Sequence, residues 1–341
     1  MQTGIRTTTP ETCTPAFPTR VLPARTAMAP DPLILRDEIE CGVVLGAQTR
    51  PEILRAARRV EELGFDSIWV GDHVSFYVPI LESLTLLSFV AAATERVRLG
   101  SGVYLLPLRH PTITAKVAAT LDVLSGGRLD LGVGVGGEFP AEFGACGVPV
   151  NERGRRANEA IEVLRKLWTG ETVEHRGKSF SFGPVTLAPG PIQTGGPPII
   201  VGGRKPPAFR RAGRLGDGYI SHMCSAEMYA ANLDAIRGYA RDAGRTEVPF
   251  RTDCFIFTIL DDDYDAALAR AAGTLQMIYN RPFEDAARKY CLLGRPEDCL
   301  EQLASFVASG ARRFVLSPLM DTGEFFARSS GMLPAIRALR G

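Results

Sequence analysis

The sequence has almost no net charge and no long apolar segment. Its 39 basic and 38 acidic residues give a formal net charge of +1 over 341 residues. Without a bulk excess of positive charge, we expect no nucleic-acid partner and no anionic membrane surface as a partner. No apolar run approaches the roughly 20 residues that cross a bilayer. What remains is a composition ordinary for a soluble globular protein, with 45% hydrophobic residues.

The sequence also lacks the cysteine pattern of a disulfide framework or a zinc site. Its seven cysteines are odd in number and include no C-x-x-C pair, which is typical of reduced thiols in a cytoplasmic protein. No H-E-x-x-H motif, Walker loop or Ser-His-Asp order is present. We therefore expect a cytoplasmic protein without a metal site.

Residues 1–36 differ in composition from the rest of the chain. They are rich in Thr and Pro and show no apolar periodicity, which predicts a disordered extension. A targeting peptide is disfavoured because no continuous apolar region precedes a cleavage site, and Met28 is an alternative start. Residues 37–341 show no composition break and are expected to form one domain.

From Cys41 onward, strand-like and helix-like segments alternate. Short apolar runs indicate strands, and apolar residues at helical spacing indicate a helix after each strand. The expected strands are residues 41–46, 67–70, 97–106, 128–135, 198–201, 218–221, 250–260 and 313–316. Eight parallel strands joined by helical crossovers predict an α/β protein with the (β/α)8 TIM-barrel fold. A nine-unit doubly wound sheet is the alternative.

A stretch rich in Gly and Pro, residues 170–198, interrupts this alternation between the fourth helix and the fifth strand. It includes a hairpin-like segment at residues 179–187. We interpret it as an insertion within the barrel. Because glycine and proline supply turns without a packed face, it is the natural candidate for a mobile pocket cover.

Ionisable residues follow several of the expected strands. Asp72 and His73 come directly after the second strand, Glu138 follows the glycines of the fourth, and His222 follows the sixth. The carboxyl ends of barrel strands meet over one pocket. Imidazole and a partly buried carboxyl can both be tuned toward neutral pH, so His73, Glu138 and His222 form a candidate acid/base set. For each residue alone, a hydrogen-bonded structural role is the alternative.

Two glycine-rich segments are candidates for ligand-binding loops. Residues 132–137 satisfy G-x-G-x-x-G, but residues 138–140 intervene and the next clear helix begins near Glu152. A dinucleotide fingerprint requires a helix at once, so this segment is weak evidence for a Rossmann fold and suits a strand packed against a flat ring. Residues 201–206 place two glycines between a strand and a helix, which favours a phosphate. A tight turn with solvated basic residues explains them equally well.

Several short motifs, spread over most of the chain, carry a family resemblance. They are residues 63–69 with Asp72 and His73, and residues 98–103, 106–111, 125–129, 167–170, 198–203 and 216–219. Together they resemble the luciferase-like monooxygenase superfamily, whose members are flavin- or deazaflavin-dependent (β/α)8 barrels. Within it, the chain is most similar to the branch that depends on coenzyme F420.

This resemblance implies catalytic roles for residues at the strand ends. The Asp-His pair of that branch lies beside the deazaflavin, so the resemblance implies that Asp72 orients the cofactor and that His73 is catalytic. Its glutamate after the fourth strand matches Glu138, a second catalytic candidate. Tyr77 stands where the sugar-phosphate dehydrogenases of the branch have a tryptophan. Tyr77 and His222 are therefore candidates for substrate contact.

The resemblance also implies a cofactor site. A bulge in the third strand, often with a non-proline cis peptide that backs the ring, would fall at Ser101, Gly102 and Val103. The backbone of Gly202 and Gly203 would lie along the phosphate-bearing tail of the cofactor.

The expected function is hydride transfer between coenzyme F420 and a small organic substrate. A lysine that follows the sixth strand in the sugar-phosphate dehydrogenases is Ser225 here, and an asparagine is Ala141, which argues against glucose 6-phosphate. One alternative is a monooxygenase that uses FMN and O2; another is a non-catalytic flavin-binding scaffold. The resemblance alone leads us to expect a homodimer.

Overall fold

Eight parallel strands close into a barrel in the computed structural model, which describes Met1 and residues 31–340. In order around the barrel they are β2 (Glu40–Val44), β3 (Ser67–Val70), β4 (Arg98–Ser101), β6 (Leu129–Gly134), β9 (Ile199–Gly202), β10 (Gly218–Ser221), β12 (Arg251–Leu260) and β14 (Arg313–Pro318). Each pairs with the next, and β14 pairs with β2. The predicted TIM barrel is confirmed, because a doubly wound sheet would stay open.

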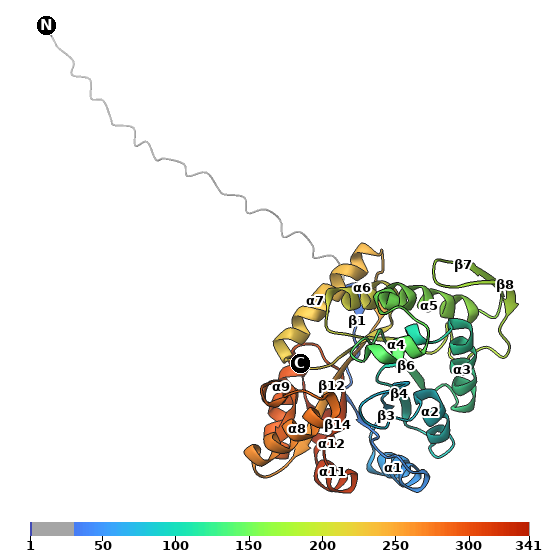
Figure 1. Cartoon of the computed structure of the whole chain (residues 1–341). Helices are drawn as coiled ribbons and strands as arrows, with labels where there is room; N and C mark the ends of the chain where they lie inside the picture. The colour runs from blue at the N-terminus through green and yellow to red at the C-terminus, as the bar shows by residue number, and fades with distance from the viewer. Residues whose placement is uncertain (2–30, 341) are drawn as a thin grey trace. The chain divides into compact units, whose positions relative to one another are not determined.

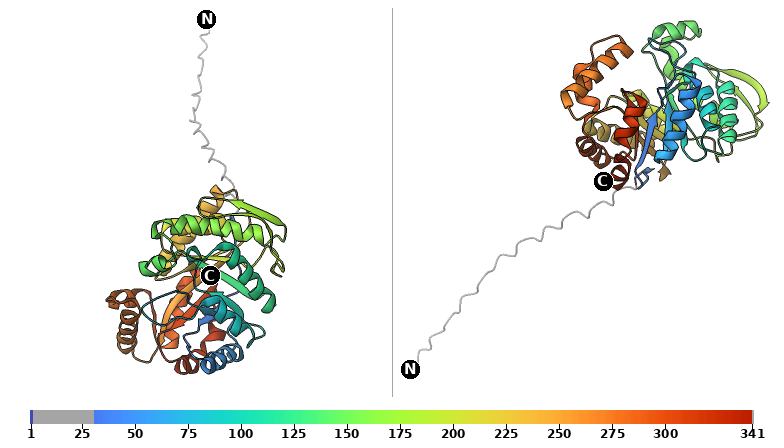
Figure 2. Two further views of the ribbon diagram at one scale, coloured as in Figure 1. Left: turned by 45° about the vertical axis from the view of Figure 1, so that its right-hand side comes forward. Right: turned by 90° about the horizontal axis from the view of Figure 1, so that it is seen from below.

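Helices surround the barrel (Figures 1 and 2). They are α1 (Arg50–Leu63), α2 (Ser83–Ala91), α3 (Pro111–Leu124), α4 (Pro140–Ala145), α5 (Arg153–Leu167), α6 (Pro206–Leu215), α7 (Ala226–Asp242), α8 (Tyr264–Tyr279), α9 (Glu284–Tyr290), α10 (Pro296–Ala308), α11 (Thr322–Ser329) and α12 (Met332–Ala338). Local signals explain their ends. At α1 the N–H of Thr49 donates to Glu52 at 3.1 Å, and Gly64 ends the helix at φ 84°, a left-handed conformation that glycine adopts without a steric penalty.

The N-terminal extension was expected to end at residue 36, but the folded unit begins earlier, at Asp31. Residues Leu33–Ile34 form β1, which pairs in parallel with β11 (Val248–Pro249), and Leu33 is buried. Asp31 also pairs with Arg237 of α7 at 2.9 Å. Residues from Asp31 onward form one unit, whereas residues 2–30 of the expected extension lie outside the described residues.

The insertion forms an antiparallel pair, β7 (Thr172–Arg176) and β8 (Ser181–Thr186). It packs beside α3 and α5 (Figure 1). Glu159 of α5 accepts hydrogen bonds from the backbone N–H groups of Ser179 and Phe180 at 2.9 Å, and Asp122 of α3 accepts those of Ile192 and Gln193 at 2.8 and 2.9 Å. These contacts hold the insertion against the outer helices, which opposes the expected role as a mobile pocket cover.

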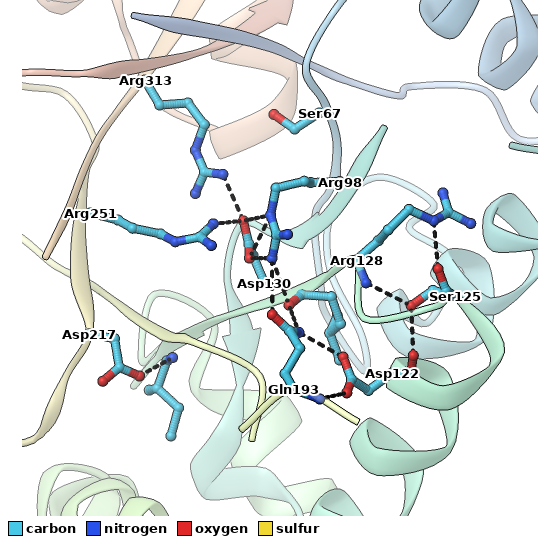
Figure 3. Close-up of polar contacts among 12 residues, drawn as sticks. Ser67, Arg98, Asp122, Ser125, Arg128, Asp130, Gln193, Asp217, Arg251 and Arg313 are labelled. Carbon is cyan, nitrogen blue, oxygen red and sulfur yellow. Dashed lines mark hydrogen bonds and ion pairs between the residues drawn. The ribbon is translucent and has the colours of Figure 1, made fainter. Parts of the chain in front are cut away.

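A buried ionic cluster fills the amino-terminal end of the barrel. Arg98, Arg251 and Arg313 converge on the carboxylate of Asp130 (Figure 3), with Arg313 Nη1 at 2.6 Å. Burial raises the pKa of Asp130, but the three guanidinium groups outweigh it and hold that pKa well below its usual range. The guanidinium of Arg313 also lies 4.8 Å from the ring centroid of Trp69, which fills the barrel interior. This cluster and Trp69 occupy the amino-terminal end of the barrel, and ligand sites of this fold lie at the opposite end, where the strands have their carboxyl ends.

Candidate active site

Asp72 connects three segments at the carboxyl end of β3. It is buried, and its carboxylate accepts hydrogen bonds from Ser83 Oγ at 3.1 Å and the N–H of Leu105 at 2.9 Å. Arg109 donates to both carboxylate oxygens, at 2.6 and 2.9 Å, a two-pronged geometry that fixes direction as well as distance. Both oxygens are thus engaged in holding the surrounding loops together.

His73 faces the barrel mouth and is held by a second carboxylate. Its Nδ1 lies 3.2 Å from each carboxylate oxygen of Glu142, and its ring stacks on Phe76 with centroids 4.0 Å apart. Glu142 is fully buried and also accepts the N–H of Val74 at 3.2 Å. An imidazole nitrogen that faces a carboxylate carries the hydrogen. In the neutral tautomer whose Nδ1 donates to Glu142, the lone pair of His73 is on Nε2, the atom that can exchange a proton with a ligand.

Glu142 is a residue that the sequence interpretation missed. The glutamate expected in the acid/base set, Glu138, is 47% exposed and pairs with Arg204 at 3.1 Å. The helix expected near Glu152 is present as α5, but a short additional helix, α4, precedes it and begins at Pro140, two residues after Glu138. This single turn of helix buries Glu142 behind His73. The available signal was a second glutamate four residues beyond the first, the spacing of one helical turn.

His222 lies at the end of β10 against aromatic side chains. Its Nε2 is 3.5 Å from the hydroxyl oxygen of Tyr279, and its ring centroid is 5.4 Å from that of Phe255 and 5.5 Å from that of Phe257. Burial, with a further contribution from Arg204, lowers the pKa of His222 to about 3. It is therefore an uncharged imidazole at neutral pH. Tyr279, at the last position of α8, is a second residue that the sequence interpretation missed.

An open hollow of about 360 Å³ lies beside His73 and is lined by residues 73–80. This volume is in the range of small-molecule sites. Tyr77, one of the lining residues, is 49% exposed, and its ring lies 5.0 Å from that of Phe139. The structure thus places Tyr77 at the rim of the hollow.

The third expected strand is split into β4 and β5 (Tyr104–Leu105), with a cis peptide between Gly102 and Val103. Ser101 is buried, and its Oγ donates to the carbonyl oxygen of Gly132 at 2.8 Å. Val103 lies between two glycines of neighbouring strands. A Cβ atom added at Gly134 would be 2.3 Å from Val103 Cγ2, and one added at Gly202 would be 2.8 Å from Val103 Cγ1. These glycines allow the close approach of strands at the barrel mouth.

The loop after β9 offers an anion fewer donors than the sequence indicated. Pro206 and Pro207 occupy the first turn of α6 and have no N–H to donate. The guanidinium of Arg204 is engaged by Glu138. Gly203 has φ 148°, and a Cβ atom there would be 2.5 Å from Ala208 Cβ. An anion here would be held by the loop backbone and by exposed Lys205, and not by a helix N-terminus.

Two findings concern only the described residues. Within residues 31–340, no three His, Cys, Asp or Glu residues lie close enough together to hold a metal ion. In the same part of the chain, no helix is long and apolar enough to cross a membrane.

Comparison with known proteins identifies the family. The model of the luciferase-like monooxygenase family matches residues 33–313, and the chain belongs to this family. It is 31% identical over 315 residues to a protein of Microbacterium testaceum named F420-dependent glucose-6-phosphate dehydrogenase, covering 84% of this chain and 93% of the relative.

Solved structures show the same fold. An F420-dependent secondary alcohol dehydrogenase in complex with an F420–acetone adduct superposes with a TM-score of 0.80 at 24% identity, over 88% of this chain and 99% of the other. The monooxygenase RslO1 from Streptomyces bottropensis gives a TM-score of 0.75 at 26% identity, over 87% of this chain and 99% of the other.

Proposed function

We propose that the protein is an oxidoreductase that uses coenzyme F420 for hydride transfer to or from a small organic substrate. The observation that carries this proposal is His73, held at the barrel mouth by buried Glu142 with Nε2 left free. The F420-dependent relative at 31% identity supports the choice of cofactor. Membership of the luciferase-like monooxygenase family, whose model matches residues 33–313, also supports the proposal.

The barrel mouth fits a flat ring with an anionic tail. Gly102 and Val103 would back the ring, and the backbone of Gly202, packed on Val103 so closely that an added Cβ atom would be 2.8 Å from Val103 Cγ1, would begin the path of the tail. Gly203 and Lys205 would lie along the phosphate-bearing tail. When bound, the deazaflavin ring would accept or donate the hydride.

The protein's own groups would handle the proton that accompanies the hydride. Nε2 of His73 would take the proton from the substrate or return it, while Glu142 keeps the hydrogen on Nδ1. Asp72, through Arg109, would hold the loop that carries His73. Glu138 remains a second acid/base candidate at the rim, with its carboxylate held by Arg204.

We further propose that glucose 6-phosphate is not the substrate. Ser225, in the place of the lysine, caps α7: its Oγ accepts the N–H of Met228 at 3.3 Å and donates to Glu227 at 2.7 Å. A helix cap provides no cation for a phosphate.

We also propose a cytoplasmic location and a homodimer. The cysteines Cys41, Cys146, Cys224, Cys254, Cys291 and Cys299 are free thiols, which supports a reducing compartment.

A monooxygenase that uses reduced FMN and O2 is the second candidate, supported by the likeness to RslO1. A fluorescence titration separates the two. Binding of F420 at micromolar concentration supports the proposal, and binding of FMN without F420 contradicts it. Oxygen consumption with supplied reduced FMN would favour the second candidate.

The variant His73→Ala tests a third alternative, a non-catalytic scaffold. For an enzyme, this substitution should abolish turnover and leave cofactor binding intact; an unchanged rate would favour the scaffold.

A further inference from the structure

Six aromatic side chains near the mouth of the barrel form one connected network of ring contacts. The members of this aromatic wall are Phe76, Tyr77, Phe139, Phe255, Phe257 and Tyr279. They come from the loops after β3 and β6, from β12 and from the end of α8. Phe76 and Tyr77 line the hollow beside His73, so the wall borders the candidate substrate space.

The wall connects the two histidines. Phe76 stacks on His73, and its ring centroid lies 6.1 Å from that of Tyr279. Tyr279 is in turn 6.4 Å from Phe257, whose ring is 5.5 Å from that of His222. These separations lie in the range of favourable aromatic pairs, so the rings present apolar surface between the two histidines.

The six members of the wall are phenylalanines and tyrosines, and the charged side chains beside them, Glu138, Arg204 and Arg281, are exposed. His222 has its pKa lowered to about 3 and is uncharged at neutral pH, and burial raises the pKa of the Tyr279 hydroxyl. The rim charges of Glu138 and Arg204 compensate each other at 3.1 Å. Arg281 is exposed, with its guanidinium over the rings of Tyr279 and Phe283. An anionic ligand would lose its hydration against this surface without a buried cation to replace it.

We propose that this wall binds an uncharged, largely apolar substrate that carries a ring, and that it discriminates against phosphorylated or carboxylated molecules. The role of that molecule as substrate rests on the proposed F420-dependent activity. The hydroxyl of Tyr279 and the free Nε2 of His73 are the polar groups that would orient it. A few polar groups on an apolar surface are the usual pattern of a site for such a ligand.

A matched pair of probes tests the proposal: acetophenone and 4-acetylbenzoate differ only by a carboxylate. Their dissociation constants are measured by calorimetry on the full chain, with and without F420. We expect acetophenone to bind with a Kd of about 1 mM or tighter, at least about tenfold tighter than 4-acetylbenzoate. Equal or tighter binding of the anion would overturn the proposal, and so would absence of acetophenone binding at about 10 mM.

The variant Glu138→Gln tests the charge argument. It removes the compensation of Arg204 at an exposed position, where a charge pair contributes up to about 1 kcal/mol, so we expect 4-acetylbenzoate to bind about two- to fivefold tighter and acetophenone binding to be unchanged. Glu62→Gln, which breaks an exposed pair with Arg59 on α1, is the matched control and should change neither. Unchanged anion binding by Glu138→Gln would contradict the charge argument. Failure of F420 to bind would contradict the proposed activity. Because the probes are also titrated without cofactor, that result can be told apart from a failure of the aromatic wall to bind them.

Discussion

The substitution Glu142→Gln tests whether a buried carboxylate sets the chemistry of His73. Glutamine has nearly the shape of glutamate, and its amide oxygen can still accept the N–H of Val74. It removes the negative charge that faces Nδ1 of His73 at 3.2 Å from both oxygens. Either ring nitrogen of His73 can then carry the hydrogen, because the amide can donate as well as accept.

The expected loss follows from the kind of hydrogen bond removed. A hydrogen bond to a charged group contributes about 1.5–3 kcal/mol, and Glu142 is fully buried, so solvent does not screen it. If that stabilisation acts when His73 carries the proton of the reaction, kcat/KM falls by about 10- to 150-fold. Affinity for F420 should stay within about twofold, because Glu142 acts through His73 and not on the ring.

The assay follows F420 absorbance with a substrate found by screening, and ¹⁵N NMR reports which nitrogen of His73 carries the hydrogen. Glu159→Gln is the matched control, because Glu159 pairs with Nε2 of His175 at 3.1 Å beside the β7–β8 hairpin. It should leave both readouts unchanged. Full kcat/KM in Glu142→Gln, or His73 protonated on Nε2 and not on Nδ1 in the unmodified protein, would refute the reasoning.

Three further substitutions test other parts of the structure. Asp130→Asn should cost about 3–5 kcal/mol of unfolding free energy in urea denaturation, because it leaves buried arginines without their carboxylate; a loss below about 1 kcal/mol would contradict this. Gly202→Ala should weaken F420 binding about tenfold, because the added Cβ meets Val103 at 2.8 Å, whereas Gly273→Ala, which meets nothing within 4 Å, should not. When the pH is lowered from 7 to 5, the His222→Gln variant should lose less thermal stability than the unmodified protein. An equal loss in both proteins would count against a buried neutral imidazole.

The sign of the His222 prediction follows from proton linkage. The folded-state pKa of about 3 lies below the ordinary value of 6.5. Between these values the unfolded chain binds a proton that the folded chain does not, so acid favours unfolding. The contribution is fully present above pH 6.5 and is lost progressively as the pH falls toward 3.

The barrel could be predicted because each strand is a short apolar run bounded by turn residues. Residues 67–70 and 218–221 were predicted with the bounds that β3 and β10 have. The shorter elements were missed. Helix α4 has six residues and β13 (Leu292–Gly294) has three, too few for a periodic pattern to emerge. Strand β1 is held by pairing with β11, more than 200 residues away, a contact that local sequence does not report.

For the candidate site, the sequence predicted the positions of residues that directly follow a strand. His73 and His222 lie where their strands indicated, but the partner of His73 depends on the direction of a one-turn helix. Adjacent residues also diverge: Asp72 turns inward to Arg109, whereas His73 faces the mouth. Tyr279 comes from a helix between the seventh and eighth barrel strands, and only the folded chain brings it to His222.

The identity of the retained cofactor tests the central claim most directly. The full chain is given F420 and FMN together at equal concentration, separated from free ligand by gel filtration, and its absorbance spectrum is recorded. We predict that the protein retains F420, and that the Gly202→Ala variant retains less of it. Retention of FMN with no F420 would contradict the account.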